Sequence, residues 1–190
     1  MESNRVKQYV GISLGFVSFL AGIYLLLLFF APTIPNLPLI KNPYPYNANN
    51  DSNENNNRIQ ISKINLEVPY LAGGPEVLEV GAWHRLPENG NPIDGGNFVL
   101  AAHRLEIGWT PGQTKKMSPF YNIDKLNVGD EIVVFYNKNR YNYTIDKIYE
   151  VEPSATYIEN RTSRPKMTLY TCTLKGAADG RVVIEAKLNN

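Results

Sequence analysis

The chain contains one cysteine and two histidines, so chemistry that needs a thiol or an imidazole has few candidates. They are Cys172, His84 and His103. A cysteine thiolate is the best protein nucleophile near neutral pH, and histidine exchanges a proton in the same range. Cys172 and one histidine could therefore form an acyl intermediate on a carbonyl substrate.

These residues fall where predicted strands meet loops. Cys172 ends a predicted strand at 166–172, and Arg181 begins the next one. If the two strands pair as a hairpin, Cys172 and Arg181 lie across its open end. His103 ends a short apolar segment, 97–103, that suits a buried strand. Barrels commonly place their sites at such strand ends.

The elements that would position these residues are mostly short strands separated by turn signals. This pattern predicts an all-β barrel or sandwich of about 130 residues. We expect a bulge near Ser62 and Lys63, where the alternation of apolar residues slips, and a hairpin at 137–139. Ser118 and Pro119 suggest the start of a short helix. The predicted strands comprise residues 58–62, 64–68, 97–103, 130–136, 140–151, 167–172 and 180–188.

Residues 9–30 contain no charged side chain and are largely apolar. As a helix they would rise by roughly 33 Å, enough to cross the hydrocarbon core of a bilayer. Arg5 and Lys7 precede this segment, and the next basic residue after it is Lys41. The positive-inside rule therefore predicts a cytoplasmic N-terminus at 1–8, a single-pass anchor and an extracytoplasmic C-terminal part.

Residues 31–57 are rich in proline and asparagine. This composition predicts a spacer that contributes no helix or central strand and separates the anchor from a folded domain at 58–190. The net charge of +1, with no basic run, gives no support for nucleic-acid binding. In an exported domain, the unpaired Cys172 is either an inert buried residue or a nucleophile.

The ordered set of segments resembles the sortase family. Residues 168–172, Thr-Leu-Tyr-Thr-Cys, followed after a loop by Arg181, are similar to the family's Thr-Leu-x-Thr-Cys…Arg signature. Ala-Ala-His-Arg at 101–104 resembles the family's histidine segment. Residues 119–135 resemble its Phe…Leu…Gly-Asp pattern, and Gly-Ala-Trp-His-Arg at 81–85 resembles a segment of some sortase classes.

The resemblance covers roughly Arg58 to Leu188 and implies a closed β-barrel of about eight strands with one or two short helices. It also implies a two-step transpeptidation. Cys172 would attack the threonine carbonyl of a Leu-Pro-x-Thr-Gly-like sorting signal and form a thioacyl enzyme. His103 would act as general acid and then general base, and Arg181 would stabilise the oxyanion or hold the substrate.

The implied partners are surface proteins that carry the sorting signal, an amine acceptor and the membrane, which the chain meets through its N-terminal helix. The acceptor would be a peptidoglycan cross-bridge or a lysine. Thr171, Trp83 and His84 are further substrate-binding candidates, with the Thr171 amide a candidate oxyanion donor. We expect no cofactor and no metal, because the glutamates of the chain show no calcium-ligand spacing.

Several alternatives stay open. His84 could replace His103 as the acid and base, and Arg181 could form only a surface ion pair. The enzyme could be a tethered cysteine peptidase that only hydrolyses, or the domain could bind envelope polymers without catalysis.

Residues 152–166 match in position the family's substrate-selecting loop. Residues 31–57 contain no Asp-Pro-aromatic lid motif, and no later apolar span follows. Both features favour a housekeeping or accessory anchoring sortase over a pilin-polymerising one.

Overall fold

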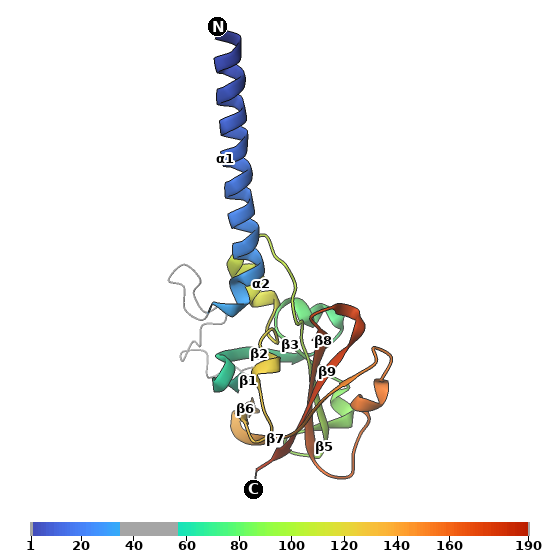
Figure 1. Cartoon of the computed structure of the whole chain (residues 1–190). Coiled ribbons are helices and arrows are strands. Elements are labelled where there is room, and N and C mark those ends of the chain that lie inside the picture. The colour runs from blue at the N-terminus through green and yellow to red at the C-terminus, as the bar shows by residue number, and fades with distance from the viewer. Residues whose placement is uncertain (1, 35–56, 190) are drawn as a thin grey trace.

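The structure is a computed structural model that describes residues 2–34 and 57–189. A long helix, α1 (Glu2–Phe30), projects from one end of a β-barrel domain (Figure 1). A single 3-10 turn, η1 (Ala31–Thr33), follows α1 and packs against the domain. The spacer predicted at 31–57 therefore begins in this turn, and most of it lies outside the described residues.

The barrel strands, which come from the whole length of the domain, are β1 (Arg58–Ile61), β2 (Leu66–Ala72), β3 (Ala82–Arg85), β5 (Gly95–Ala101), β6 (Glu131–Tyr136), β7 (Asn139–Val151), β8 (Lys166–Thr173) and β9 (Gly176–Leu188). Their order is β3-β2-β1-β6-β7-β9-β8-β5, and pairing between β5 and β3 closes the ring. A very short strand, β4 (Gly90–Asn91), pairs with β5. The expected closed barrel of about eight strands is confirmed.

Two of the ladders, β2–β3 and β5–β8, are parallel, and the other ladders are antiparallel. Side chains alternate between the interior and the outer surface along each strand. In β8, Met167 and Leu169 belong to the buried core. Tyr170 and Cys172, at the intervening positions, therefore face outward. This alternation decides which side chains can meet on the barrel wall.

One of the two predicted irregularities between strands is confirmed, and the other is wrong. The predicted hairpin at 137–139 joins β6 to β7, and Asn137 and Lys138 have φ values of 48° and 66°, as a type I′ turn requires. The bulge predicted near Ser62 is wrong. A 3-10 turn, η3 (Ser62–Ile64), reverses the chain there, and β1 and β2 pair antiparallel. The slip in the apolar alternation therefore marks a chain reversal.

The short helix predicted after Ser118 is a single 3-10 turn, η6 (Ile123–Lys125), and a helix that was not predicted lies before it. Helix α2 (Pro111–Met117) has Thr110 as its N-cap, and a reciprocal capping box joins Thr110 to Gln113. Ser118 lies at the end of this helix, so its prediction as an N-cap is wrong. Its hydroxyl instead accepts from the Glu106 N–H at 3.0 Å and donates to the Glu106 carbonyl at 3.2 Å. Ser118 thus holds the loop between β5 and α2.

Candidate active site

Cys172 lies between two neighbouring strands that carry the other candidate residues. In the β8–β9 ladder, Cys172 is directly opposite Arg181. On the other side of β8, the parallel ladder with β5 places Ala101 opposite Tyr170. His103 follows Ala101 by two residues, as Cys172 follows Tyr170. The same register, continued past the end of β5, therefore brings His103 beside Cys172.

The three residues line one cavity of about 290 Å³ on the outer wall of the barrel. Strand alternation explains why they share this face. Val182 and Ala102 belong to the core cluster, so Arg181 and His103, their neighbours in sequence, face outward. Trp83 also lines the cavity, and in the β3–β5 ladder it lies opposite Ala101. The barrel wall therefore presents a thiol, an imidazole, a guanidinium and an aromatic ring to one space.

The loop between β7 and β8 covers the other side of this cavity. Its 3-10 turn, η7 (Thr156–Glu159), contributes Thr156, Ile158 and Glu159 to the lining. The buried amide of Asn97 donates to the carbonyls of Ile158 and Asn160 at 2.8 and 3.0 Å. The loop predicted at 152–166 to match the substrate-selecting loop thus borders the cavity and is fixed to β5.

A network that the sequence analysis missed connects this loop to the barrel wall. Arg85 Nε lies 2.7 Å from Glu159 Oε1, and Arg85 Nη2 donates to Glu159 Oε2 at 3.1 Å. The Tyr170 hydroxyl donates to Glu159 Oε1, and the Arg85 guanidinium stacks 4.4 Å above the Trp83 ring. Burial and the hydrogen bond to Glu159 raise the pKa of Tyr170, so this hydroxyl stays protonated as a donor.

Only part of this network was readable from the sequence. Arg85 shares a strand face with Trp83 because it lies two residues away, and Tyr170 shares one with Cys172 in the same way. Glu159 gives no such signal, because it lies in a loop. Among the described residues, no group of three or more His, Cys, Asp or Glu could hold a metal ion.

Arg181 is held by the backbone at the tip of its own hairpin. Its Nη1 donates to the carbonyls of Ala177 and Gly180 at 2.7 and 3.0 Å. Two acidic side chains near it in sequence bond elsewhere: Asp179 accepts from Thr173, and Glu185 pairs with Lys166. Since a guanidinium has further N–H donors on Nε and Nη2, Arg181 can also donate toward the cavity.

His84 lies away from the other candidates. It is 5% exposed, and its ring packs edge-on against Tyr70 and Phe98 inside the barrel. Its Nε2 lies 3.2 Å from the Gly90 carbonyl, and burial lowers the pKa of the ring. His84 is not among the residues that line the cavity around Cys172, because its neighbour Trp83 occupies the outward-facing position of β3. His84 therefore lies inside the barrel and not at the cavity around Cys172.

Thr171, a substrate-binding candidate that also lines the cavity, and Arg104, next to His103, have structural contacts. The Thr171 hydroxyl donates to the Ala102 carbonyl at 2.7 Å, which joins β8 to the end of β5 just before Cys172 and His103. Arg104 is 4% exposed and pairs with Asp124 at 2.8 Å. Arg104 therefore fixes the backbone that follows His103, while Arg181 is the arginine opposite Cys172.

Comparison with known proteins identifies the family of the barrel domain. The family model described as "Sortase domain" matches residues 59–189. The chain is 28% identical over 142 residues to sortase A of Bacillus anthracis, which covers 75% of this chain and 63% of that protein. The chain thus spans less than two thirds of that relative's length.

Two solved structures are similar across most of the barrel domain. The sortase D5 transpeptidase of Clostridium perfringens is 29% identical, with a TM-score of 0.59 and coverage of 81% of this chain and 96% of that one. The pilus-related sortase C of Group B Streptococcus is 27% identical, with a TM-score of 0.59 and coverage of 72% and 68%. Because the family match covers residues 59–189, well over half of the chain, the chain belongs to the sortase family, whose members are cysteine transpeptidases.

Proposed function

We propose that this chain cleaves a Leu-Pro-x-Thr-Gly-like sorting signal and transfers the cleaved protein to an amine of the cell envelope. Cys172 is the nucleophile, His103 the general acid and base, and Arg181 the residue that stabilises the oxyanion. The observation that carries the proposal is the strand order: Cys172 on β8 has Arg181 opposite it on β9 and the end of β5, with His103, on its other side.

In the first step, the Cys172 thiolate attacks the carbonyl carbon of the threonine, and a C–S bond forms. The carbonyl oxygen gains negative charge, which the Arg181 guanidinium neutralises with its remaining forked donors. When the C–N bond to glycine breaks, His103 protonates the departing amine. The sorting signal is then a thioester on Cys172.

In the second step, an incoming amine attacks the thioester and His103 removes a proton from it. An amide bond forms, the C–S bond breaks, and Cys172 leaves as a thiolate ready for the next substrate. The covering loop around η7 favours this outcome, because it restricts the space that water can occupy beside the thioester. Trp83 and the η7 loop contact the residues of the signal that precede the threonine.

We further propose that α1 anchors the enzyme in the membrane, with the barrel on the extracytoplasmic side. The segment Gly11–Thr33 is 23 residues long, with a mean hydropathy of 2.4, and only 11% of its most apolar window is buried in the protein. A helix that exposes apolar side chains on all faces needs a lipid environment. Arg5 and Lys7 then remain on the cytoplasmic side.

The absence of an Asp-Pro-aromatic motif from residues 31–57 supports an anchoring role, housekeeping or accessory, over pilin polymerisation. The acceptor in that role is the free amine of a peptidoglycan cross-bridge. A lysine of another protein subunit is the acceptor in the polymerising role. Purified enzyme supplied with both amines in competition distinguishes them, because the anchoring assignment predicts amide formation chiefly with the cross-bridge peptide.

Mass spectrometry of a sorting-signal peptide incubated with the enzyme and an amine tests the activity. The proposal predicts an amide product whose share rises with amine concentration. Cleaved acid alone, even at high amine concentration, would identify a cysteine peptidase. No cleavage of any signal peptide, together with intact cellular function in Cys172→Ala, would identify a non-catalytic envelope-binding domain.

A further inference from the structure

The loop that joins β5 to α2 exposes two large apolar side chains beside the long helix. Ile107 is 55% exposed and Trp109 is 88% exposed. Tyr24, in α1, donates a hydrogen bond from its hydroxyl to the Trp109 carbonyl. In Figure 1, α2 lies beside the end of α1 that meets the barrel. The loop that follows His103 is therefore in contact with the apolar helix.

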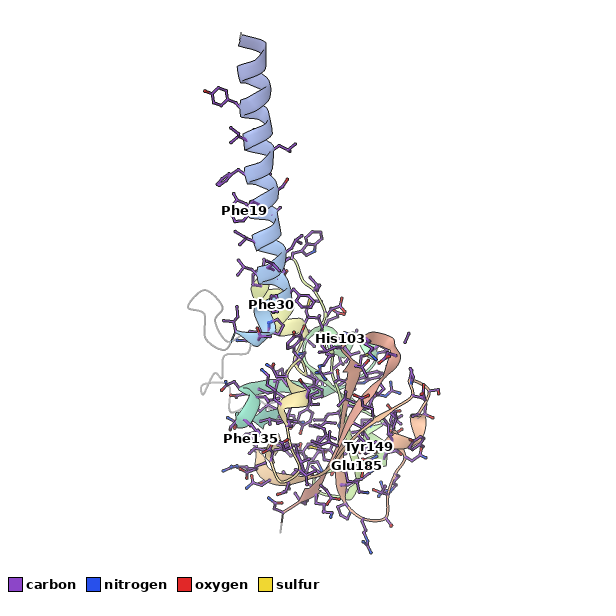
Figure 2. All side chains as sticks on the ribbon, in the orientation of Figure 1. Phe19, Phe30, His103, Phe135, Tyr149 and Glu185 are labelled. Atoms are coloured by element: carbon purple, nitrogen blue, oxygen red, sulfur yellow. The ribbon has the colours of Figure 1, made fainter. Side chains whose placement is uncertain are left out.

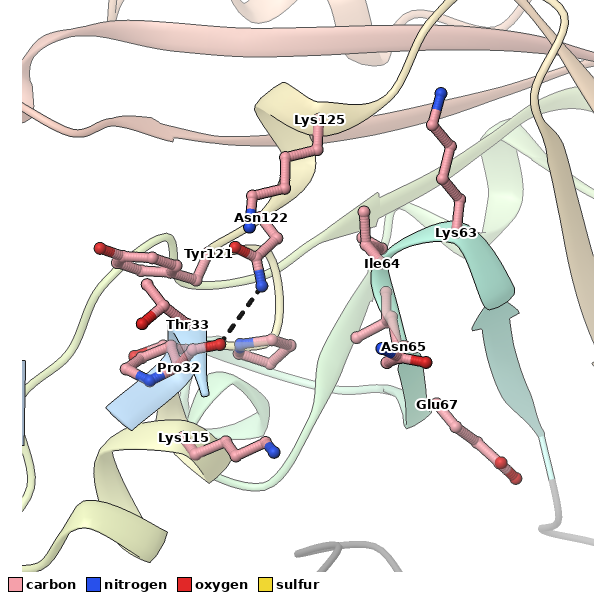
Figure 3. A pocket seen from close by; sticks show the side chains of 13 residues that line it. Pro32, Thr33, Lys63, Ile64, Asn65, Glu67, Lys115, Tyr121, Asn122 and Lys125 are labelled. Carbon is pink, nitrogen blue, oxygen red and sulfur yellow. Dashed lines mark hydrogen bonds between the residues drawn. The ribbon is translucent and has the colours of Figure 1, made fainter. Parts of the chain in front are cut away.

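The junction between α1 and the barrel is held by several contacts. Leu28 and Ala31 are buried against the domain. Asn122 donates to the Pro32 carbonyl at 3.2 Å, as Figure 3 shows at the side of a polar cavity. Lys115, at the end of α2, donates to the Ile34 carbonyl at 3.2 Å. These contacts around η1 fix the barrel relative to the helix.

The length of α1 places Tyr24 at the level of the lipid. Lys7 is the last charged residue before the apolar segment. Residues 8–23 would rise by only about 24 Å as a helix, which is shorter than the hydrocarbon core of roughly 30 Å, and tilting increases the length required. The hydrocarbon core must therefore extend past Tyr24 toward Phe30. Trp109, bonded to Tyr24, lies at the same depth.

The backbone of the loop is suited to that environment. A peptide group at the level of lipid needs an internal hydrogen-bond partner, because water is scarce there. The Trp109 carbonyl accepts from Tyr24, and the Trp109 N–H donates to Gln113 Oε1 at 2.9 Å. The Gly108 N–H donates to Thr114 Oγ1 at 3.0 Å. Side chains of α1 and α2 thus satisfy the backbone around an exposed tryptophan, a residue type that is enriched at membrane interfaces.

We propose that residues 107–109 insert into the outer leaflet of the membrane, where Ile107 and Trp109 contact phospholipid acyl chains close to the headgroups. The inference takes the membrane span of α1 proposed above as its basis. Lipid is the occupant because the exposed side chains continue the lipid-facing surface of α1, in which Leu25, Leu26 and Phe30 are exposed by 63%, 59% and 47%. The loop is a second membrane contact beside the anchor.

This contact has a consequence for the candidate active site. His103 lies at the end of the barrel nearer α1 (Figure 2) and begins the segment that leads to Trp109. The insertion therefore holds the cavity around Cys172 at a fixed height and orientation above the bilayer. A protein substrate still held in the same membrane would meet the cavity at that height.

Tryptophan fluorescence tests the insertion, because the chain contains only Trp83 and Trp109. Full-length Trp83→Phe leaves Trp109 as the probe, and full-length Trp109→Phe leaves Trp83 as the matched control. Both variants are reconstituted in phosphatidylglycerol-containing vesicles with or without lipids brominated near the headgroup end of the acyl chain. We expect brominated lipid to lower the Trp109 emission about twofold and to leave the Trp83 emission nearly unchanged.

Alkaline extraction of the same vesicles separates this inference from the span on which it rests. A chain that stays with the vesicles while Trp109 emission is unquenched overturns the inference and leaves the span intact. A chain that is extracted overturns both. Brominated lipid could also leave Trp109 emission unchanged while the emission varies with the protein-to-lipid ratio. That result would indicate contact with a second copy and would contradict lipid insertion.

A spin label at position 107 gives an answer that does not depend on the folding of Trp83→Phe. Attachment of a nitroxide to one site requires a single thiol, so Ile107→Cys is combined with Cys172→Ala. We expect the label to be more accessible to dissolved oxygen than to a water-soluble nickel complex. The reverse order of accessibility would place the side chain at position 107 in water and contradict the proposal.

Discussion

Cys172 and Arg181 are directly opposite each other in the β8–β9 ladder, and the register shifts just beyond them, between Cys172 and Thr173. The pair therefore occupies the last regular position before the hairpin widens toward its tip. Backbone pairing sets the separation of the two Cα atoms, and the Ala177 and Gly180 carbonyls hold the guanidinium. Replacing the side chain of Cys172 or Arg181 should therefore reduce enzyme activity much more than it reduces the stability of the fold.

Arg181→Lys tests whether the forked geometry of the guanidinium matters beyond its charge. We expect kcat/KM for peptide cleavage to fall about 100-fold, as for the loss of an oxyanion donor, because an ammonium cannot replace several fixed N–H groups. Arg140→Lys, at an exposed position of β7, is the matched control and should retain full activity. Unchanged kcat/KM in Arg181→Lys would show that charge alone is sufficient.

Substitution of the two histidines should have very different effects on enzyme activity. His103→Gln removes the proposed acid and base, and we expect kcat to fall by about 10²- to 10⁴-fold. His84→Gln changes a ring inside the barrel that does not line the cavity, so activity per folded molecule should stay within about threefold, in keeping with a substitution distant from the chemistry. The opposite ranking would assign the proton transfers to His84.

His84 should also make the stability of the fold depend on pH. Burial lowers its pKa in the folded chain, while the unfolded chain binds the proton near pH 6.5. Between these two pKa values the unfolded state holds more protons, so the free energy of unfolding falls as the pH decreases below about 6.5. Above that pH, His84 contributes no pH dependence.

Thermal unfolding of the wild type and His84→Gln between pH 8 and pH 5 measures this effect. The decrease in Tm with acidification should be smaller in the variant, in which no imidazole titrates at position 84. Parallel Tm profiles for the two proteins would show that His84 binds its proton equally well in the folded and unfolded chains.

The pair formed by Arg85 and Glu159 should control how the η7 loop is held over the cavity. Glu159→Gln keeps the shape of the side chain but leaves the Arg85 guanidinium without its counter-charge. We expect the free energy of unfolding to fall by about 1–3 kcal/mol, and KM to rise more than kcat falls, because the role proposed for the loop is substrate binding and not proton transfer.

A double-mutant cycle with Arg85→Gln separates the pair from its surroundings. If the two side chains act together, the double variant should be little worse than either single variant. If the effects of the two substitutions on KM are additive in free energy, Arg85 and Glu159 contribute independently. A fall in kcat alone would place Glu159 in the chemical step.

The sequence predicted most of what local patterns control. Alternation of apolar residues identified the strands that hold Cys172 and Arg181, and the Asn137–Lys138 turn followed from residues that join two strand patterns. Helix α2 was not predicted, because the short helix was expected after Ser118, although Thr110 and Gln113 already form a capping-box pattern in the sequence. That error came from giving Ser118 more weight than Thr110.

The remaining features depend on contacts between distant segments. Nothing near Glu159 in the sequence indicates a partner at Arg85, 74 positions away, and the contact exists only because the β7–β8 loop folds across β3. The inward orientation of His84 could have been predicted from the outward face required of Trp83 and Arg85. The bond between Tyr24 and Trp109 likewise depends on how α1 meets the barrel.

Intact-mass measurement of the enzyme with a sorting-signal peptide tests the central claim most directly. We expect the wild type, mixed with the peptide without an amine acceptor, to gain the mass of the signal up to its threonine, and Cys172→Ala to gain none. Hydroxylamine should release the adduct, because a thioester reacts with it. An unchanged wild-type mass with a peptide that the enzyme demonstrably cleaves, or the same adduct on Cys172→Ala, would contradict the proposed mechanism.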